Sequence, residues 1–482
     1  MNPKKLIFFL LICMSTLAFS QNRRRGDTLS ITLKPSYDDF SAIQKALDNK
    51  GGKYLKIILD GKFVVGKTLV TRRNNTMLFF TKKSQLKSVS NINGILLIVH
   101  NNCIVKNGKF IGNNQSTDTF YNGFGVQLSD TENCKILNSE FSGISGLPIF
   151  LSYSRKGCKN NIVENNRIFK PAINLSQGGD EAGIMLGYSG DGYFHENNTI
   201  SNNVIDGGDV LEIGAGIIGH GRNNTFSGNE ISNCLSYGIV AYESAYTDVS
   251  LSGTIVKGNT IRNIGQVGEK TTVKGMGIYL MKSMDSKVSE NKLYNTLRNS
   301  DKSETLGAGA IAISGAINAI VENNLIDGSG MYGFVNDYSF NFKFRNNTIK
   351  NTVKSGAYFI NVSNGDIESN YFENIGAVVL RGYFENTGLD YIKKQWKIST
   401  YLNLETGQNL KIINNTFDSE KEILYFKGTS GKEQKIENKI KNNIFADNTI
   451  VRRSNTPLKD EDIAFRTESG NNIIKNNIIK KN

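Results

Sequence analysis

The chain has 482 residues, with 48 glycines, 5 prolines and a formal net charge of +13 from 57 Lys and Arg against 44 Asp and Glu. Hydrophobic residues make up 39% of the chain, enough for a sizeable core, which excludes wholesale disorder. The small number of prolines argues against a string of modules joined by proline-rich linkers.

The first twenty residues have the pattern of a secretory signal. Lysines at positions 4 and 5 precede an apolar run, 6–18, that is too short to span a bilayer. Small residues just before Gln21 predict cleavage there, and an uncleaved anchor is the alternative. We therefore expect a mature chain of residues 21–482 that is secreted or periplasmic and does not insert into a membrane.

The expected mature chain remains basic, because the signal segment carries two lysines and no acid. A basic exported protein attracts polyanions, and export makes an acidic or sulfated polysaccharide a better partner than nucleic acid. The alternative is that the charge only aids solubility. With only 3 histidines and no CxxC motif, the sequence argues against a histidine or cysteine metal site.

A short motif recurs along the chain, in which an asparagine, often doubled, precedes a variable residue and then an aliphatic or aromatic one. A second series of short apolar strands, which follow glycine or another small residue, alternates with the first. Two short strands joined by turns, repeated every 22 residues or slightly more, are typical of one rung of a parallel β-solenoid. Examples of the two series are SNNVID (201–206), SGNEIS (227–232), VENNLID (321–327) and FRNNTIK (344–350), and GIVAYE (238–243), GIYLMK (277–282) and GFVNDY (333–338).

The repeat predicts an all-β, single-domain solenoid over 21–482, since propeller blades and sandwich hairpins fit the spacing less well. An asparagine at each corner tolerates the turn conformation, and its amide can bond to the asparagine of the next rung. Cys103 and Cys134 hold equivalent places in successive rungs and should stack, as buried thiols or, alternatively, as a disulfide.

Two segments depart from the repeat. Residues 36–47 form an expected short amphipathic helix, with Ile43 and Leu47 on one side, that caps the first rung, and strands follow over 53–65. An insertion at about 383–410 carries the single tryptophan, Trp396, and the rungs resume after it.

The chain resembles the pectin lyase-like right-handed parallel β-helix superfamily over about residues 30 to 480. The motifs that carry the resemblance are the cap DDFSAIQKAL, the strands KYLKIILDGKFVVGKTL that follow it, and the asparagine-containing rungs. The resemblance implies a right-handed parallel β-helix. Members of the superfamily include polysaccharide lyases, glycoside hydrolases, sugar epimerases and non-enzymatic adhesins, so function has to be argued from the side chains on one sheet.

The alternation of strands places a candidate catalytic group on one outer face. In GIVAYE, Ile239 and Ala241 should point inward and Tyr242 outward, with Glu243 at the strand end. The same register puts His220 outward on the preceding rung and Lys282 at the strand end on the following one. We take Lys282, His220, Tyr242 and Glu243 as catalytic candidates, because groups of this kind can transfer protons.

Elsewhere the outward positions are expected to carry small residues, which makes this group stand out. The alternative for each of its members is a solvated surface side chain. Candidate substrate-binding residues lie on neighbouring rungs and in the expected loops and insertion: Tyr188, Arg222, Glu181, Asp337, Tyr338 and Trp396.

The favoured chemistry is β-elimination from a uronate-containing chain. A base removes the proton α to the carboxylate while a cation such as Arg222 neutralises that group. The segment KSMDSKVSENKLYN (282–295) resembles the part of the chondroitinase B and alginate lyase family that carries its catalytic lysine, which implies Lys282 as the base. That family has an arginine one rung later, where this chain has Ser314.

Two other functions stay open. Glycoside hydrolysis would use two carboxylates, Glu243 with Asp337 or Glu181 with Glu243. The third class is a non-catalytic carbohydrate-binding β-helix, and C5-epimerisation is a variant of the lyase chemistry. We expect a monomer.

No cofactor is predicted. Asp206, Asp209 and Glu212 could form an oxygen site for Ca²⁺, with an acidic turn as the alternative. Glycine-rich pieces lack the strand–helix context that phosphate binding needs.

Overall fold

The structure is a computed structural model that describes most of the chain. The described residues are 23–89, 92–113, 123–144, 146–152, 155–169, 182–187, 195–208, 213–242, 251–265, 275–297, 308–384, 406–428, 440–452, 459, 462–466 and 470–481. The chain divides into two compact units, Met1–Gln177 and Gly178–Asn482, and each is described by itself. The expected signal segment, 1–20, lies outside the described residues.

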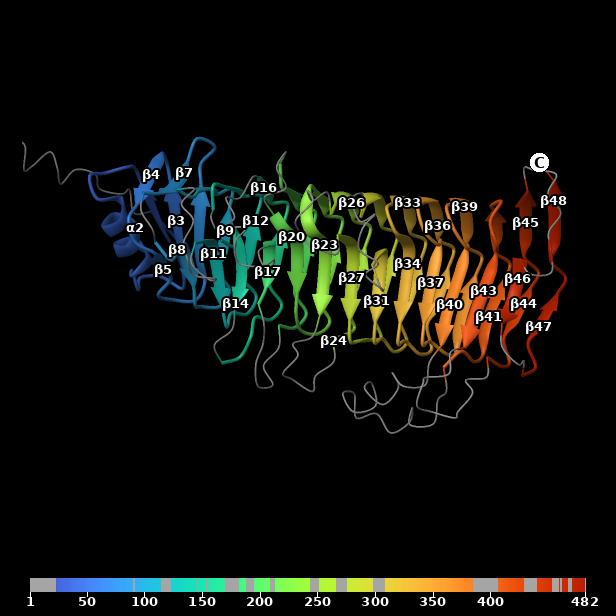
Figure 1. Ribbon diagram of the computed structural model, residues 1–482. Coiled ribbons are helices and arrows are strands. Elements are labelled where there is room, and N and C mark those ends of the chain that lie inside the picture. Colours follow the sequence, from blue (N-terminus) through green and yellow to red (C-terminus); the bar gives the residue numbers. More distant parts are fainter. Residues whose placement is uncertain are drawn as a thin grey trace, which may run out of the picture. The chain divides into compact units, whose positions relative to one another are not determined.

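A short helix, α2 (Asp39–Leu47), lies at the start of the first unit, as predicted (Figure 1). Asp38 caps it by accepting a hydrogen bond of 3.0 Å from the backbone N–H of Ser41. Ile43 and Leu47 are buried on one face of the helix, which contacts the first strands of the unit. In the described part of the chain, no helix combines the length and the apolar character needed to cross a bilayer.

The strands of the first unit stack in three parallel sheets, named A, B and C in the order in which each rung of chain visits them. β1 (Arg23–Arg25) adds an antiparallel edge to β2. Sheet A contains β2 (Thr28–Leu33), β3 (Tyr54–Leu59), β6 (Thr76–Phe80), β9 (Ile104–Lys106), β12 (Lys135–Leu137) and β15 (Ile162–Glu164). Sheet B contains β4 (Lys62–Val65), β7 (Gln85–Ser88), β10 (Lys109–Ile111), β13 (Glu140–Ser142) and β16 (Arg167–Phe169), and sheet C contains β5 (Leu69–Val70), β8 (Gly94–Ile98), β11 (Phe124–Ser129) and β14 (Ile149–Ser152).

The second unit has the same three parallel sheets, seen in Figure 1 as strands side by side from green to red. Sheet A contains β18 (Thr199–Ser201), β21 (Thr225–Ser227), β25 (Ile255–Lys257), β29 (Lys287–Ser289), β32 (Ile320–Glu322), β35 (Lys343–Arg345), β38 (Gly365–Glu368), β41 (Leu410–Ile413), β44 (Ile444–Ala446) and β47 (Ile473–Lys475). Sheet B contains β19 (Val204–Asp206), β22 (Glu230–Ser232), β26 (Thr260–Ile264), β30 (Lys292–Thr296), β33 (Leu325–Ser329), β36 (Thr348–Thr352), β39 (Tyr371–Ile375), β42 (Thr416–Asp418), β45 (Thr449–Arg452) and β48 (Ile478–Lys481). Sheet C contains β17 (Ala182–Leu186), β20 (Ile213–Gly219), β23 (Cys234–Tyr242), β27 (Met276–Met281), β31 (Gly309–Ser314), β34 (Tyr332–Asp337), β37 (Ala357–Ile360), β40 (Leu380–Phe384), β43 (Leu424–Gly428) and β46 (Ile463–Arg466), and β24 (Leu251–Ser252) pairs separately with β28 (Ser283–Met284).

Each rung has three strands, where the sequence pattern indicated two. The asparagine motif spans the corner between sheets A and B, as in β32 and β33, and the strand that follows the small residue is sheet C. A strand of three residues such as β35, which buries only its middle residue, Phe344, is too short to show a clear alternation. The parallel β-solenoid itself is confirmed.

The two asparagines of a doubled pair divide the predicted roles: the first takes the turn conformation and the second bonds to the next rung. Asn323 takes the left-handed conformation at the corner, with φ of 56°, while Asn324 points inward and is buried. The Asn324 amide donates to Oδ1 of Asn347 on the next rung at 2.9 Å. Equivalent bonds join 203, 229, 259, 291, 324, 347, 370, 415, 448 and 477, so the ladder continues across the insertion after β40.

Several sheet C strands carry a glycine near their start that has a packing role, as Gly333 does in β34. A Cβ added at Gly333 would lie 2.5 Å from Cγ2 of Ile349 and 2.6 Å from the carbonyl oxygen of Gly356. At Gly333 a side chain would therefore clash with the neighbouring strands.

Cys103 and Cys134 stack on adjacent rungs of the first unit, as predicted. The backbone N–H of Cys103 donates to Sγ of Cys134 at 3.3 Å, and both are free, buried thiols.

Candidate functional site

The predicted catalytic positions meet at one end of three consecutive strands in the second unit. Register pairs Gly219 of β20 with Ala241 of β23, and Ala241 with Leu280 of β27. Positions 220, 242 and 282 follow these strand residues closely, so the backbone brings them together as the sequence predicted. Their catalytic roles remain predictions.

His220, which the alternation placed outward, is not exposed to solvent. The residue is buried, with 2% of its surface exposed, and its carbonyl accepts a 3.2 Å hydrogen bond from the amide of Asn224.

Lys282 lies at the corner that follows β27. Its backbone has φ of 53°, unusual for a lysine, and its N–H donates to the carbonyl of Ser314 at 2.7 Å. Tyr338 takes the same left-handed conformation at the equivalent corner two rungs later, as predicted. Ser314 itself pairs with Met281, so the corner that stacks on Lys282 is that of Gly315, with φ of 65°.

The two other described candidates occupy different surroundings. The backbone of Arg222 pairs with that of Glu196 in an isolated parallel β-bridge. Arg222 lies after β20, in the segment that leads into sheet A. Asp337 ends β34, and Oδ2 of its carboxylate lies 3.5 Å from Oγ of Ser314. Asp337 therefore shares an outward column with Ser314 and Met281, next to Lys282, while the role of Arg222 stays a prediction.

Several candidates lie outside the described residues: Glu181, Tyr188, Glu243, Trp396 and the side chain of Tyr242. Asp209 and Glu212 of the expected Ca²⁺ cluster do so as well. Their partner Asp206 accepts hydrogen bonds from the backbone of Gly208 at 3.0 Å and from the amide of Asn233 at 2.8 Å. Among the described residues, no three His, Cys, Asp or Glu side chains gather as metal ligands would.

A row of tyrosines, missed in the sequence analysis, runs along the outer side of sheet C. We name it the tyrosine face and define it as Tyr279, Tyr332, Tyr358, Tyr383 and Tyr425. The ring centroids of Tyr332 and Tyr358 lie 4.9 Å apart, those of Tyr358 and Tyr383 6.1 Å, and those of Tyr383 and Tyr425 6.2 Å. The outward positions are therefore not limited to small residues.

Two columns of outward side chains carry four of these tyrosines, because parallel register stacks equivalent positions, and Tyr332 packs in the same cluster as Val335 and Tyr358. The first column is Tyr279, Ala312, Val335, Tyr358, Arg381 and Tyr425, and the second is Met281, Ser314, Asp337, Ile360, Tyr383 and Lys427. The same alternation that placed Tyr242 outward in GIVAYE would have found Tyr279 in GIYLMK.

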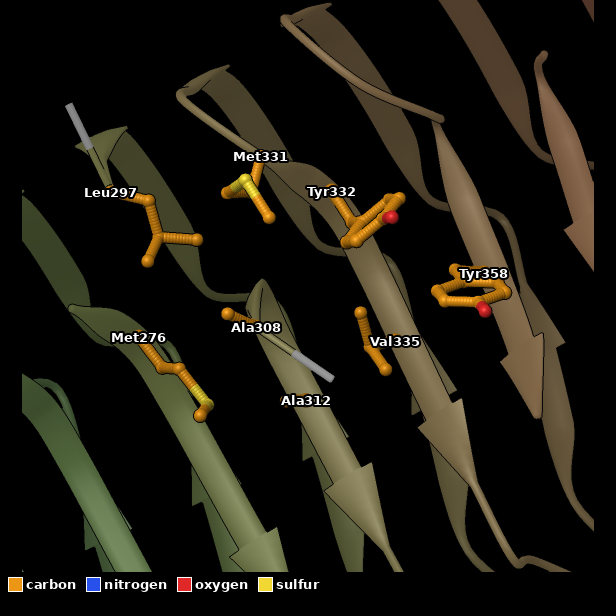
Figure 2. Close-up of a cluster of buried hydrophobic side chains, with 8 residues drawn as sticks. All are labelled: Met276, Leu297, Ala308, Ala312, Met331, Tyr332, Val335 and Tyr358. Carbon is orange, nitrogen blue, oxygen red and sulfur yellow. The ribbon is translucent and has the colours of Figure 1, made fainter. Parts of the chain in front are cut away.

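An apolar cluster surrounds the tyrosines in the middle rungs. Figure 2 shows Tyr332 and Tyr358 on neighbouring strands, beside Met331 and Val335. Met276, Leu297, Ala308 and Ala312 complete the cluster. These side chains are buried although several face outward from the sheet, so the tyrosine face combines an apolar, sheltered part with half-buried rings at Tyr279, Tyr383 and Tyr425.

Burial keeps the tyrosine hydroxyls protonated. It raises the pKa of Tyr279 to about 12, and the nearby Tyr237 adds to the shift, while a hydrogen bond with Ser314 opposes it. Burial raises the pKa of Tyr358 in the same direction. At neutral pH these groups act as hydrogen-bond donors and not as bases.

A groove in the first unit is a weaker candidate for a catalytic site than the tyrosine face. It is lined on sheet A by Tyr54, Lys56, Met77 and Ile104, among others. Its lining contains no acid and no histidine that could share a proton with Lys56. We therefore place the candidate site on the tyrosine face.

A comparison with protein families decides the classification. The model described as "right handed beta helix region" matches residues 93–293 and 215–417. The chain belongs to this right-handed β-helix family. No curated protein sequence matches the chain.

Solved structures of other right-handed β-helix proteins are similar to the chain in fold. The surface adhesin PfbA of Streptococcus pneumoniae matches with a TM-score of 0.55 and 16% identity, over 71% of this chain and 88% of the adhesin. The catalytic unit of a thermostable GH87 α-1,3-glucanase from Streptomyces thermodiastaticus matches with a TM-score of 0.53 and 15% identity, over 76% of this chain and 67% of the glucanase. Identities this low establish the fold and leave the function to the site.

Proposed function

We propose that this right-handed β-helix protein is a secreted enzyme that cleaves an acidic polysaccharide on the outer face of sheet C, by β-elimination. The tyrosine face is the observation that carries the proposal. Tyrosine offers a flat apolar ring for the apolar side of a sugar and a hydroxyl for its polar edge. The half-buried rings of Tyr279, Tyr383 and Tyr425 are the ones that a polymer running along the stack could contact.

The solved structures support a carbohydrate ligand in general terms. One GH87 α-1,3-glucanase catalytic domain, with a TM-score of 0.55 and 15% identity over 76% of this chain and 67% of that domain, was solved with tetrasaccharides bound. The net charge of +13 supports an anionic polymer for this chain. The signal pattern of residues 1–20 supports export.

The arrangement of acids favours elimination over hydrolysis. Hydrolysis needs two carboxylates about 5 to 9.5 Å apart. In the two outward columns described, Asp337 is the single carboxylate. Glu243, its suggested partner, follows a strand three rungs away, about 14 Å at a spacing of about 4.8 Å per rung.

In the elimination that we propose, Lys282 removes the proton α to the uronate carboxylate. The electron pair of the broken C–H bond forms the new double bond, and the glycosidic oxygen leaves and takes up a proton. Tyr242 and Glu243 are the candidates for donating that proton. The burial of His220 makes it a positioning residue rather than a contact of the polymer.

The experiment uses polygalacturonate, alginate and chondroitin sulfate as substrates. Ultraviolet absorbance of an unsaturated uronate means elimination, whereas new reducing ends without this absorbance mean hydrolysis, the alternative activity. Lys282→Ala should abolish cleavage, while Lys292→Ala, on the exposed side of sheet B, should leave it unchanged. Binding without cleavage of any substrate would contradict the proposed enzymatic activity and indicate a carbohydrate-binding protein.

A further inference from the structure

Arg381 shares an outward column of sheet C with Tyr358 and Tyr425, and it is half-buried between two rings. Its guanidinium carbon lies 5.7 Å from the ring centroid of Tyr358 and 5.1 Å from that of Tyr383. One terminal nitrogen donates to the hydroxyl of Tyr383 at 3.1 Å. These contacts hold the planar group in one orientation.

The charge of Arg381 has no counter-ion among the described residues. Two other arginines of the second unit have one: Arg345 pairs with Glu322 at 2.8 Å and Arg452 with Asp462 at 3.4 Å. In addition, Nε of Arg381 is buried and makes no hydrogen bond within the described part of the chain. A half-buried cation with an unused donor carries a desolvation cost that a bound anion would offset.

The surroundings of Arg381 are suited to a sugar that bears an acid group. In register, Arg381 lies beside Tyr425, and Tyr383 lies beside the exposed Lys427. An aromatic surface for the ring and two cations for an oxyanion therefore occur together on β40 and β43. The guanidinium fork matches two oxygens of a carboxylate or a sulfate.

We propose that Arg381, caged by Tyr358 and Tyr383, is a subsite that binds the carboxylate or sulfate of an acidic sugar. The inference rests on the proposed function, since it assumes a polysaccharide on this face. Arg381 lies four rungs from Lys282, about 19 Å at about 4.8 Å per rung. The subsite therefore binds a distant unit of the polymer and selects anionic chains without touching the reacting bond.

Titration calorimetry of the purified protein tests this subsite with three polymers: polygalacturonate for carboxylate, dextran sulfate for sulfate and dextran as the neutral chain. Arg381→Gln should weaken binding of at least one anionic polymer about tenfold, the loss of one charge-assisted contact, and leave dextran unchanged. Which anionic polymer loses affinity identifies the acid group. The matched control is Arg167→Gln, which removes an exposed arginine that also lies beside a ring, that of Phe169, at 5.9 Å.

Equal losses in the two variants, or none in either, would overturn the subsite, because the binding would then be general attraction between charges. Chemical modification of the wild-type protein, with and without bound polymer, tests the subsite even if Arg381→Gln misfolds. Phenylglyoxal should modify Arg381 in the free protein and less so with the anionic polymer bound, as read by mass spectrometry, and equal modification would again contradict the proposal.

The two proposals fail separately. Cleavage of a glycan that does not depend on Arg381 would contradict the subsite and support the proposed enzymatic activity. Binding of anionic polymers that depends on Arg381, without cleavage, would support the subsite and contradict the proposed enzymatic activity.

Discussion

Asn347 and Asn370 form one step of the buried amide ladder, in which Nδ2 of Asn347 donates to Oδ1 of Asn370 at 3.0 Å. The same Oδ1 accepts the backbone N–H of Asn347 at 2.9 Å, and the Asn347 amide also donates to the carbonyl of Val321 at 3.0 Å. Each step thus satisfies polar groups that the stacking of rungs removes from water.

Asn347→Ala should lower the free energy of unfolding by about 1 to 3 kcal/mol, because it leaves the donors of Asn324 without their acceptor inside the core. Urea unfolding followed by circular dichroism measures the change. The adjacent Asn346 is exposed and has φ of 54°, which glycine adopts freely, so Asn346→Gly serves as the control and should cost only a few tenths of a kcal/mol. Equal losses at the two positions would show that the ladder adds nothing beyond the corner.

Gly333→Ala should destabilise the protein by about 1 to 3 kcal/mol, since the new methyl group would meet Ile349 at 2.5 Å and a backbone oxygen at 2.6 Å. Gly258 provides the contrast: it has φ of 64°, a Cβ there would meet nothing within 4 Å, and other rungs carry asparagine at this corner. Gly258→Asn should therefore leave the thermal unfolding midpoint unchanged. A well-tolerated Gly333→Ala would refute the packing explanation.

The repeat could be predicted from the sequence because its motif consists of residues that the corners between strands require. Asparagine at left-handed corners, and glycine where Gly333 packs on Ile349, meet local requirements that recur on many rungs. The number of strands per rung could not be counted, since a strand as short as β35 has a single inward residue.

The candidate site was predicted less completely, and the reason is local geometry. Alternation placed His220 and Tyr242 outward and Lys282 at the strand end. In the structure His220 is buried, Lys282 lies at the corner after β27, and the side chain of Tyr242 lies outside the described residues. The tyrosine face was within reach of the same reasoning, because Tyr279 and Tyr383 occupy outward positions on regular strands.

Four thiols should be unreactive in the folded protein: Cys103, Cys134, Cys158 and Cys234, all buried and free. Burial raises the pKa of Cys158 to about 12, so little thiolate forms at mildly alkaline pH. Iodoacetamide should label none of the four before unfolding and all of them in guanidinium chloride, as counted by mass spectrometry. A pair that stays unlabelled in denaturant until a reductant is added would mean that Cys103 and Cys134 are bonded after all.

Stability should depend on pH through Glu322, whose side chain is 9% exposed between Lys287 and Arg345 on sheet A. The hydrogen bond with Lys287 lowers the pKa of Glu322, burial acts in the opposite sense, and the hydrogen bond with Arg345 lowers it further, so that the folded value is below the usual 4.5. Because the unfolded chain binds the proton more tightly, this contribution is present above pH 4.5 and is lost as the pH falls through the folded value.

Glu322→Gln should therefore reduce the free energy of unfolding by roughly 1 kcal/mol at neutral pH and by much less in acid, where the wild-type carboxyl is itself protonated. Urea unfolding at both pH values measures the difference. Glu290→Gln is the matched control, since Glu290 is 54% exposed and pairs with Lys257 at 3.3 Å, and it should have little effect at either pH. A Glu322→Gln deficit that persisted in acid would point to lost packing instead of lost charge.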